Sequence, residues 1–493
     1  MKKQVLSILL AAMMVCSFFA SCSTTKTDNS KVSSGSTDSS ITDDTDVDNQ
    51  SDVTDSTSSA SGTNESTSKN GNTATTASGK STTKKTKGVA VLPDIKGDHI
   101  DASAMVLPNL NITNKTVKVL CHGGEFENLD NFYKKYGIKI EYDRVVNTEK
   151  TAKLQKRIAA GDSPDVFCCI FYPSLVTRNY VQNLDKYFDY NSKVWSGIKN
   201  MLDNYMWGGK HYYMDIRYAV DGCVWYNKDI FDEYGLTDPW TLYKQNKWNW
   251  NTYKSYAKQL TVDANKDGTP EQWGVDMGAM ELVNNSTGKG FITYVKNGTP
   301  ANNLKSAEIA RAINFCMDLR KNGYIYLNGS GSEAFAAGKV GMSWGYIWQR
   351  EPYKDLIESD SLGLAPSPRD PSADKYYMYT SSEGYYIPRG AKNPTGAVAL
   401  LTALRINSFN DTLIRTSKTN LIKKGIWTNE FQTVYDKMQS CENLVIDPWA
   451  TFNLGDYFGD FYTRAATESW SKIAAEISPK VDATITKMYS TNK

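Results

Sequence analysis

The segment GMSWG at residues 341–345 has the G-x-S-x-G pattern of the nucleophile elbow in α/β-hydrolases. In that motif a strained turn presents the serine to a histidine base, and the triad follows in the chain order serine, acid, histidine. A histidine should therefore come after Ser343. The chain has only three histidines, and all of them precede that serine: His99, His122 and His211. The motif does not favour a hydrolase, and a buried strand is the simpler interpretation.

A second pattern with chemical meaning is DANKDGTPE, which begins at Asp263. Its Asp263, Asn265 and Asp267 stand at positions 1, 3 and 5 of a calcium loop, whose oxygen ligands wrap a hard cation. Position 12 of such a loop is a bidentate Glu, but this chain has Gly274 there. The three residues are weak calcium candidates, because a solvated turn rich in Asp and Asn explains the pattern without a metal. No cofactor is predicted.

Several other function classes are not indicated. The sequence has no GxxxxGK[ST] loop, so any energy for transport must come from a partner ATPase. A net charge of +2 suggests neither a nucleic-acid partner nor an anionic polymer. No cysteine spacing suggests zinc. Six cysteines follow residue 90, and we expect most of them to be small buried apolar residues, although an exported location permits disulfides: Cys121, Cys168, Cys169, Cys223, Cys316 and Cys441.

Aromatic residues are concentrated after residue 90, where all 12 Trp lie. Aromatic faces stack on the apolar C–H faces of sugars, and they also fill the cores of large domains. The bias is therefore compatible with a carbohydrate site or with core packing alone.

The elements that must position these residues follow from periodicity. Strand patterns cover residues 116–121, 138–146 and 164–171, and helical patterns cover 127–137 and 148–163 between them. This β-α-β-α-β order predicts an α/β fold with a parallel sheet and helices on both faces. Ligands of such sheets bind at the carboxyl ends of the strands. Glu125 follows the first strand and Tyr172 follows the third, so both are candidate ligand residues.

The chain leaves this first sheet near residue 221. DGCVWY at 221–226 predicts one more strand, and NKDIFDEYG predicts a short helix that ends at Gly235. A further helix, NWNTYKSYAKQLT, follows a loop that contains proline. A second lobe is therefore expected to begin here.

The first 90 residues have a different character. Residues 1–21 combine Lys2 and Lys3 with a short apolar run and small residues before Cys22, which is typical of an export signal. FASC at 19–22 resembles the lipobox of bacterial lipoproteins, so Cys22 is predicted to carry lipid; ordinary signal cleavage nearby is the alternative. Residues 22–90, rich in Ser, Thr, Asp and Asn, are predicted to be a disordered tether that spans roughly 45 Å.

Successive segments of the remainder resemble one known family. They include YNKDIFDEYGLTDPWT, WNWNTYKSYAKQLTVDANKDGTPEQWG, IAAGDSPDVF, FAAGKVGMSWG and YYIPRGAKNPTGAVALL. Their order over residues 116–410 resembles extracellular solute-binding protein family 1, the binding lipoproteins of sugar-importing ABC transporters. The resemblance implies a two-lobe periplasmic-binding-protein-like fold over 91–493, with hinge crossovers and a ligand cleft. Lobe one is expected at 115–225 and 380–440, and lobe two at 226–379 and 441–493.

The resemblance also implies, by segment position, which residues bind the solute. Its acids would accept hydrogen bonds from hydroxyl groups, and its aromatic residues would stack on a sugar; core packing or a solvated loop is the alternative for each. Two departures, the loop HYYMDIRY without proline and the inserted LYKQNK, leave the ligand class open. The implied residues are Glu125, Tyr172, Asp215, Trp344, Trp348, Glu383 and Trp449.

The function predicted from these features is that of a binding protein without catalytic activity. We expect a monomeric lipoprotein, anchored to the outer face of the bacterial cell membrane, that captures a carbohydrate by lobe closure and delivers it to permease subunits. One alternative is a non-sugar solute, such as a peptide or a phosphorylated polyol, which Lys210 and Arg217 would suit. The other is a surface-anchored glycoside hydrolase, because two acids can meet across a cleft without any sequence signature.

Overall fold

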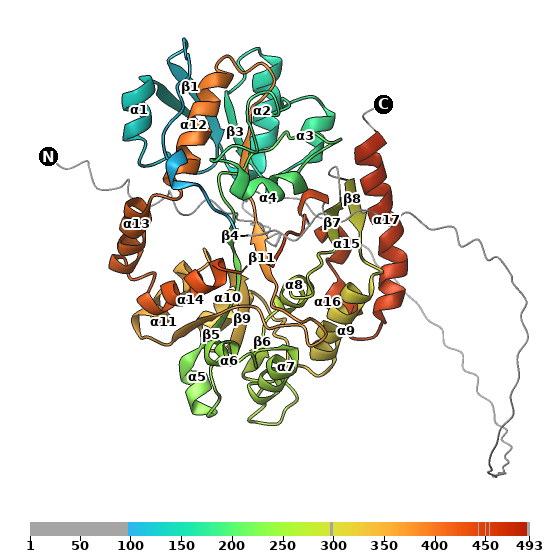
Figure 1. Cartoon of the computed structure of the whole chain (residues 1–493). Coiled ribbons are helices and arrows are strands. Elements are labelled where there is room, and N and C mark those ends of the chain that lie inside the picture. The colour runs from blue at the N-terminus through green and yellow to red at the C-terminus, as the bar shows by residue number, and fades with distance from the viewer. Residues whose placement is uncertain (1–96, 296–298, 442, 449, 453, 491–493) are drawn as a thin grey trace, which may run out of the picture. The chain divides into compact units, whose positions relative to one another are not determined.

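The computed structural model describes residues 97–295, 299–441, 443–448, 450–452 and 454–490 (Figure 1). The predicted signal segment, Cys22, the whole tether and Trp449 lie outside the described residues.

The sheet of lobe one has the strand order β12-β3-β1-β2. Strands β1 (Thr116–Cys121), β2 (Lys139–Arg144) and β3 (Val166–Cys169) run parallel, which confirms the predicted β-α-β-α-β unit. The fourth strand, β12 (Gly384–Tyr386), arrives from much later in the chain and pairs antiparallel with β3. The sheet therefore joins two distant parts of the sequence.

Helices α1 (Asp130–Tyr136), α2 (Lys150–Ala159) and α12 (Pro394–Asn407) belong to the same lobe. Helix α1 ends at Gly137, whose φ of 60° is left-handed and favours glycine. Both α2 and α12 pack against β1. Arg405 of α12 is fully buried and its guanidinium holds Asp98 at 2.8 Å, so the segment that precedes β1 is part of the folded body.

The sheet of lobe two has the order β10-β5-β9-β6. Strand β5 (Gly222–Asn227) is the strand predicted at 221–226, and β9 (Val340–Tyr346) contains the GMSWG segment. Strand β6 (Trp273–Val275) runs parallel to β9, whereas β10 (Leu362–Ala365) pairs antiparallel with β5. The helices after β5 are α5 (Lys228–Glu233), α6 (Pro239–Lys244) and α7 (Trp250–Gln259).

A small third sheet connects the two lobes. Its strand order is β13-β11-β4, with β4 (Ala219–Val220), β11 (Met378–Ser381) and β13 (Leu444–Val445). In Figure 1, β4 and β11 lie between the upper and lower lobes. We call this the crossover sheet, since β4 leads from lobe one into β5 and β11 leads back to β12.

The remaining elements lie outside these three sheets, and two of them, β7 and β8, form a two-stranded antiparallel sheet. The helix α17 (Trp470–Ser490) packs on α3, α9 and β8, so it contacts segments from widely separated parts of the chain. No described helix is long and apolar enough to cross a membrane. The other elements are α3 (Pro173–Thr177), α4 (Lys199–Asn204), α8 (Ala279–Asn285), β7 (Ile292–Val295), β8 (Thr299–Asn302), α9 (Ala307–Lys321), α10 (Gly331–Ala336), α11 (Lys354–Glu358), α13 (Asp411–Lys423), α14 (Asn429–Gln439), α15 (Gly455–Phe458) and α16 (Phe461–Arg464).

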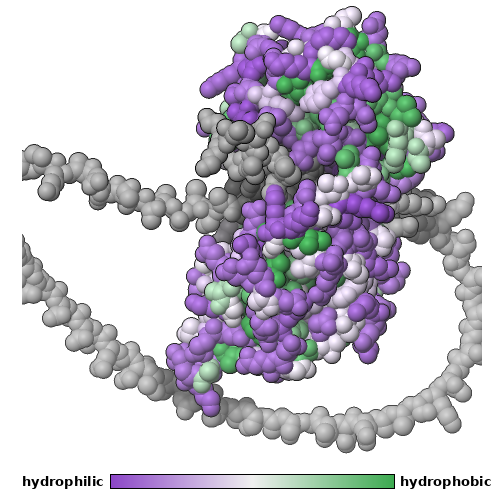
Figure 2. Space-filling model, turned by 90° about the vertical axis from the view of Figure 1, so that its left-hand side faces the viewer, coloured by the Kyte–Doolittle hydropathy of each residue, from purple (hydrophilic) through white to green (hydrophobic). Residues whose placement is uncertain are grey.

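Of the six cysteines after residue 90, five are free and buried, and Cys441 is partly exposed. Cys168 and Cys169 lie in β3, as the apolar run predicted. The face shown in Figure 2 is largely hydrophilic, with scattered apolar residues. Burial of the core, rather than disulfides among the described residues, stabilises the body.

Candidate functional site

The carboxyl ends of the parallel strands in both lobes meet the crossover sheet. In lobe one, Cys169 at the end of β3 pairs with Gly384, three residues after β11 ends. In lobe two, Tyr346 at the end of β9 pairs with Gly222, two residues after β4 ends. Because ligands bind at the carboxyl ends of strands in open α/β sheets, the candidate site lies where these ends face the crossover sheet.

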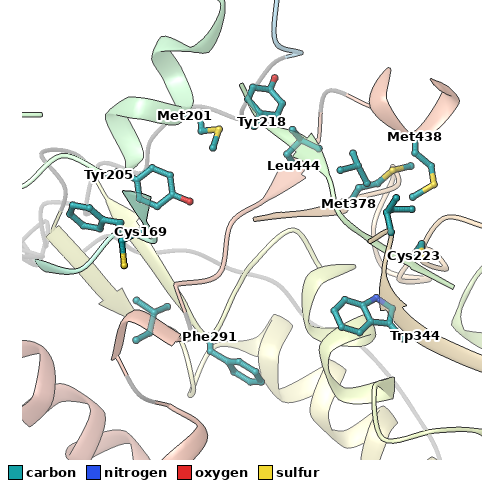
Figure 3. Close-up of a cluster of buried hydrophobic side chains, with 14 of the residues drawn as sticks. Cys169, Met201, Tyr205, Tyr218, Cys223, Phe291, Trp344, Met378, Met438 and Leu444 are labelled. Atoms are coloured by element: carbon teal, nitrogen blue, oxygen red, sulfur yellow. The ribbon is translucent and has the colours of Figure 1, made fainter. Parts of the chain in front are cut away.

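Four aromatic residues gather at the lobe-two side of this site, and we call them the aromatic cluster. Tyr346 stacks on Trp348 with ring centroids 5.5 Å apart and an interplanar angle of 11°. The ring of Tyr346 also lies 5.2 Å from Trp344 and 6.0 Å from Tyr379 of the crossover strand β11. The close-up in Figure 3 shows Trp344 among buried side chains from both lobes and the crossover sheet.

The indole nitrogens of this cluster are unusual. The Nε1 atoms of Trp344 and Trp348 are both buried and have no hydrogen-bond partner among the described residues. A buried donor left without an acceptor costs about 1–3 kcal/mol. Both indoles are therefore available to donate to an oxygen that enters the site.

Two carboxylates extend from the carboxyl end of β6. Asp276 follows this strand directly; it accepts hydrogen bonds from the Ser343 hydroxyl and, at 3.0 Å, from the Gly278 N–H, and burial raises its pKa to about 6. Glu281 on α8 is also shielded from water, which raises its pKa to about 7, and the negative charges of Asp276 and Asp447 add to this effect. Among the described residues, no side-chain hydrogen bond to the Glu281 carboxylate is found. Both acids can accept hydrogen bonds from hydroxyl groups.

A polar triad occupies the lobe-one side. The Lys150 Nζ donates to Glu383 Oε1 at 2.6 Å, and both side chains are almost completely buried. The imidazole of His122, the first residue after β1, lies beside them: its Nδ1 is 3.3 Å from Lys150 Nζ and 3.4 Å from Glu383 Oε1. Burial lowers the pKa of His122, so the ring is neutral near pH 7. We call these three residues the lobe-one triad.

The residues predicted from the sequence have different environments. Trp344 and Trp348 belong to the aromatic cluster, and Glu383 belongs to the lobe-one triad. Tyr172 occupies the N-cap position of α3, three residues after β3 ends, and its backbone N–H donates to the Tyr386 hydroxyl at 2.7 Å. These four residues thus lie on elements that reach the candidate site.

Glu125 and Asp215 lie in other surroundings. The Glu125 side chain is exposed and pairs with Arg144 at 3.0 Å. Asp215 is buried, which raises its pKa to about 7, and it accepts hydrogen bonds from the Ser382 hydroxyl and the backbone of Ile216 and Arg217. Asp215 therefore has a structural network that ties residues 215–217 to the crossover. Trp449 lies outside the described residues.

The segment that begins at Asp263 forms a turn with internal hydrogen bonds. Asp263 Oδ2 accepts from the Gly268 N–H at 2.9 Å, and Asp267 Oδ1 accepts from the Thr269 N–H at 2.8 Å. Asn265 Oδ1 accepts from the Asp267 N–H at 2.8 Å. No group of three His, Cys, Asp or Glu side chains in the described part of the chain is arranged to hold a metal ion. The bonds are those of an Asp- and Asn-rich turn, and calcium binding stays a prediction.

Ser343 of the GMSWG segment is buried within β9 and donates to Asp276. Ser343 lies inside a strand, whereas the hydrolase motif places its serine at a strand-to-helix turn. The side-chain hydrogen bond described for Ser343 goes to Asp276 and not to a histidine. The described geometry does not resemble a nucleophile site.

Sequence reasoning missed His122, Asp276, Glu281, Tyr346 and Tyr379. A usable signal existed for some of them, because His122 and Asp276 follow directly after strands. For the first strand, the sequence analysis selected Glu125, which lies three residues beyond His122. No sequence pattern indicated Glu281 or Tyr379, because their positions in the site depend on packing between distant segments.

The sequence profile of bacterial extracellular solute-binding proteins matches residues 127–410, more than half of the chain. The chain belongs to this family. Family members bind solutes outside the cytoplasm, so the recognition of a solute-binding protein made from sequence segments is confirmed. The chain matches no curated protein sequence.

Solved structures of the same fold include sugar-binding proteins. One is an extracellular solute-binding protein from Staphylococcus aureus in complex with maltose, with 14% identity, a TM-score of 0.57, and coverage of 77% of this chain and 100% of that chain. Another is a cyclic α-maltosyl-1,6-maltose binding protein from Arthrobacter globiformis, with 15% identity, a TM-score of 0.55, and coverage of 76% of this chain and 100% of that chain. A third is an ABC substrate-binding protein from Listeria monocytogenes in complex with cycloalternan, with 16% identity, a TM-score of 0.52, and coverage of 76% of this chain and 99% of that chain. These similarities confirm the predicted two-lobe α/β fold.

Proposed function

We propose that the protein is the extracellular substrate-binding lipoprotein of an ABC importer, and that it captures a neutral carbohydrate, an oligosaccharide, by lobe closure. The observation that carries this proposal is the combination at one site of the aromatic cluster with acceptors and unused donors. Aromatic faces stack on sugar C–H faces, while carboxylates and indole N–H groups fix hydroxyl groups in orientation. Two of the three similar structures are complexes with sugars and the third is a sugar-binding protein, which supports the same class of solute.

Lobe closure would complete the site. The crossover sheet is small, and its strands β4 and β13 have two residues each, so few backbone hydrogen bonds resist a change in the angle between the lobes. Closure would bring the lobe-one triad toward the aromatic cluster, so that both hold the same solute. Closure would also expel water and strengthen the polar contacts. The protein would act by binding and release to the permease, without catalysis.

The two alternatives have less support. Phosphate groups would be repelled by Asp276 and Glu281, and Lys210 and Arg217, which suggested an anionic solute, are both exposed. A glycoside hydrolase needs two carboxyl groups on opposite sides of the scissile bond, whereas Asp276 and Glu281 both extend from the carboxyl end of β6. A neutral sugar is the solute that the described groups suit best.

The test is a thermal-shift screen of the full chain without residues 1–21 and with Cys22→Ser, which keeps it soluble. Neutral mono- and oligosaccharides, sugar phosphates and short peptides would be compared. A ligand at 100 times its dissociation constant adds about 2.7 kcal/mol to the free energy of unfolding. A rise in melting temperature with an intact neutral sugar is expected. A rise only with a phosphate or a peptide would contradict the carbohydrate assignment, and release of reducing ends would indicate a hydrolase.

A further inference from the structure

We propose that the lobe-one triad fixes His122 as a neutral hydrogen-bond donor that presents its Nε2–H to an acceptor oxygen of the solute. This inference rests on the proposed function and adds a specificity residue to it. It assigns His122 to direct contact with the solute and Lys150 and Glu383 to positioning His122.

The first step concerns the charges around the ring. The charged groups that reach His122 are Lys150 and Glu383. They form an ion pair of 2.6 Å whose side chains are 2% and 0% exposed. Burial opposes the ammonium, but the neighbouring Cys169 and Glu383 side chains keep the pKa of Lys150 raised, so this lysine stays charged within the pair. Its opposite charges largely cancel at the ring, and burial then decides that the imidazole is neutral.

The second step is the tautomer. An ammonium group only donates hydrogen bonds, so the contact of 3.3 Å from Lys150 Nζ requires Nδ1 of His122 to be the acceptor. Glu383 Oε1 lies 3.4 Å from the same nitrogen, but of these two neighbours only Lys150 meets it in hydrogen-bond geometry. A neutral imidazole with an acceptor at Nδ1 carries its proton at Nε2. The triad thus selects the Nε2–H form.

The third step is direction. Nδ1 faces two side chains that are themselves buried, yet 19% of the His122 side chain is exposed. We infer that the exposed part includes the side of the ring that carries Nε2. His122 is the first residue after β1, at the carboxyl edge where the lobe-one sheet meets the crossover sheet. A hydroxyl, ring or glycosidic oxygen of a sugar is the acceptor that this N–H suits.

The experiment uses the full chain from residue 22 with Cys22→Ser and 15N-labelled histidine. With three histidines in the chain, His122→Gln assigns the signals of His122 by difference. At pH 7 the spectrum should show a protonated Nε2 and an unprotonated Nδ1, and the His122 ring should become protonated at a lower pH than an ordinary histidine. A protonated Nδ1, or an imidazolium at pH 7, would overturn the proposal.

The positioning role is tested by replacing the buried pair with apolar residues of similar size, Lys150→Met with Glu383→Leu. Such replacements of a whole buried pair are often tolerated, whereas removal of one partner is not. The variant should keep a cooperative thermal transition, but its Nδ1 should lose the fixed acceptor state and populate both tautomers. An unchanged, single Nε2–H form in this variant would contradict the role of the pair.

Solute contact is tested with a defined mixture of neutral di- and trisaccharides of glucose, mannose and galactose. His122→Gln places an amide N–H near the position of Nε2, whereas His122→Asn places it near Nδ1. The Asn variant should need about tenfold more of the mixture than the Gln variant to reach half-saturation, the loss expected for one hydrogen bond. Equal binding by both variants would contradict donation from Nε2. Absence of binding by the wild type would instead overturn the proposed function and with it solute contact, while the tautomer remains readable from the spectrum.

Discussion

At the scale of single residues, the site depends on groups whose surroundings alter their chemistry. Glu281 is the clearest case, because a carboxylate shielded from water beside other acids is stabilised in its protonated form. The shielding from water that makes Glu281 a good acceptor for a sugar hydroxyl also makes its negative charge destabilising in the ligand-free protein.

We predict that Glu281→Gln stabilises the ligand-free protein at pH 8. The folded-state pKa of Glu281, about 7, lies above its ordinary value of 4.5, so the folded state binds more protons between these values. Its contribution to stability is therefore complete below about pH 4.5 and is lost as the pH rises through 7. Removal of the charge should raise the free energy of unfolding at pH 8 by about 1–3 kcal/mol, with little change at pH 4.

Urea denaturation at the two pH values measures this difference. Glu333→Gln, at an exposed position in the first turn of α10, serves as the matched control and should change stability little at either pH. Equal effects of Glu281→Gln at pH 4 and pH 8 would show that the shift of the Glu281 pKa is absent.

The residue scale also shows where sequence reasoning was weakest. Glu383 was selected as a ligand acid, but its partner Lys150 lies 233 positions earlier, and no local pattern joins the two. Trp344 and Trp348 could be found because they follow a recognisable segment. The nearby acids Asp276 and Glu281 could not be found from the sequence, because the burial of a carboxylate without a counter-charge depends on three-dimensional packing.

At the scale of elements, the local βαβ pattern gave reliable predictions, because each strand and helix has its own apolar period. β1 was predicted with its observed bounds, and the ends of α1 and α2 were indicated by Gly137 and Gly161, both with positive φ. The pairing of β12 with β3 could not be predicted from period alone, since it joins segments more than two hundred positions apart. The inserted LYKQNK forms the end of α6 and the turn after it, so it extends lobe two without altering its sheet.

The segment before β1 provides a prediction at this scale. Asp98 accepts two hydrogen bonds from the fully buried Arg405, whose guanidinium also donates to the carbonyls of Val194, Ile216 and His99. Asp98→Ala leaves a buried cation without its carboxylate, so the free energy of unfolding should fall by about 3–5 kcal/mol. Asp101→Ala, which removes an exposed carboxylate of the same segment, should reduce the free energy of unfolding much less. Chemical denaturation of both variants measures the difference, and a loss of similar size in both would contradict the structural role of Asp98.

At the scale of the whole molecule, the sequence predicts an N-terminal targeting and anchoring segment followed by a solute-binding body. The predicted signal, Cys22 and tether would attach the protein to the membrane, and the two lobes would bind the solute. If Cys22 carries lipid, Cys22→Ser should move the protein from the membrane fraction to the growth medium without changing its affinity for a sugar, because stable anchoring needs acyl chains. Fractionation and labelling with a radioactive fatty acid measure this. Retention of the serine variant in membranes would show that another segment anchors the protein.

The last prediction concerns the coupling of binding to shape. If the aromatic cluster and the lobe-one triad hold one solute, an added sugar should draw the lobes together and lower the radius of gyration measured by small-angle X-ray scattering. Trp348→Ala removes one stacked ring, so the sugar concentration at half-closure should rise roughly tenfold or more. Tyr234→Ala, which removes an exposed ring at the end of α5, should leave that concentration unchanged. Closure of the Trp348 variant at the wild-type concentration would place the solute away from the aromatic cluster, whereas binding without any change in radius would show that capture does not use the crossover sheet as a hinge.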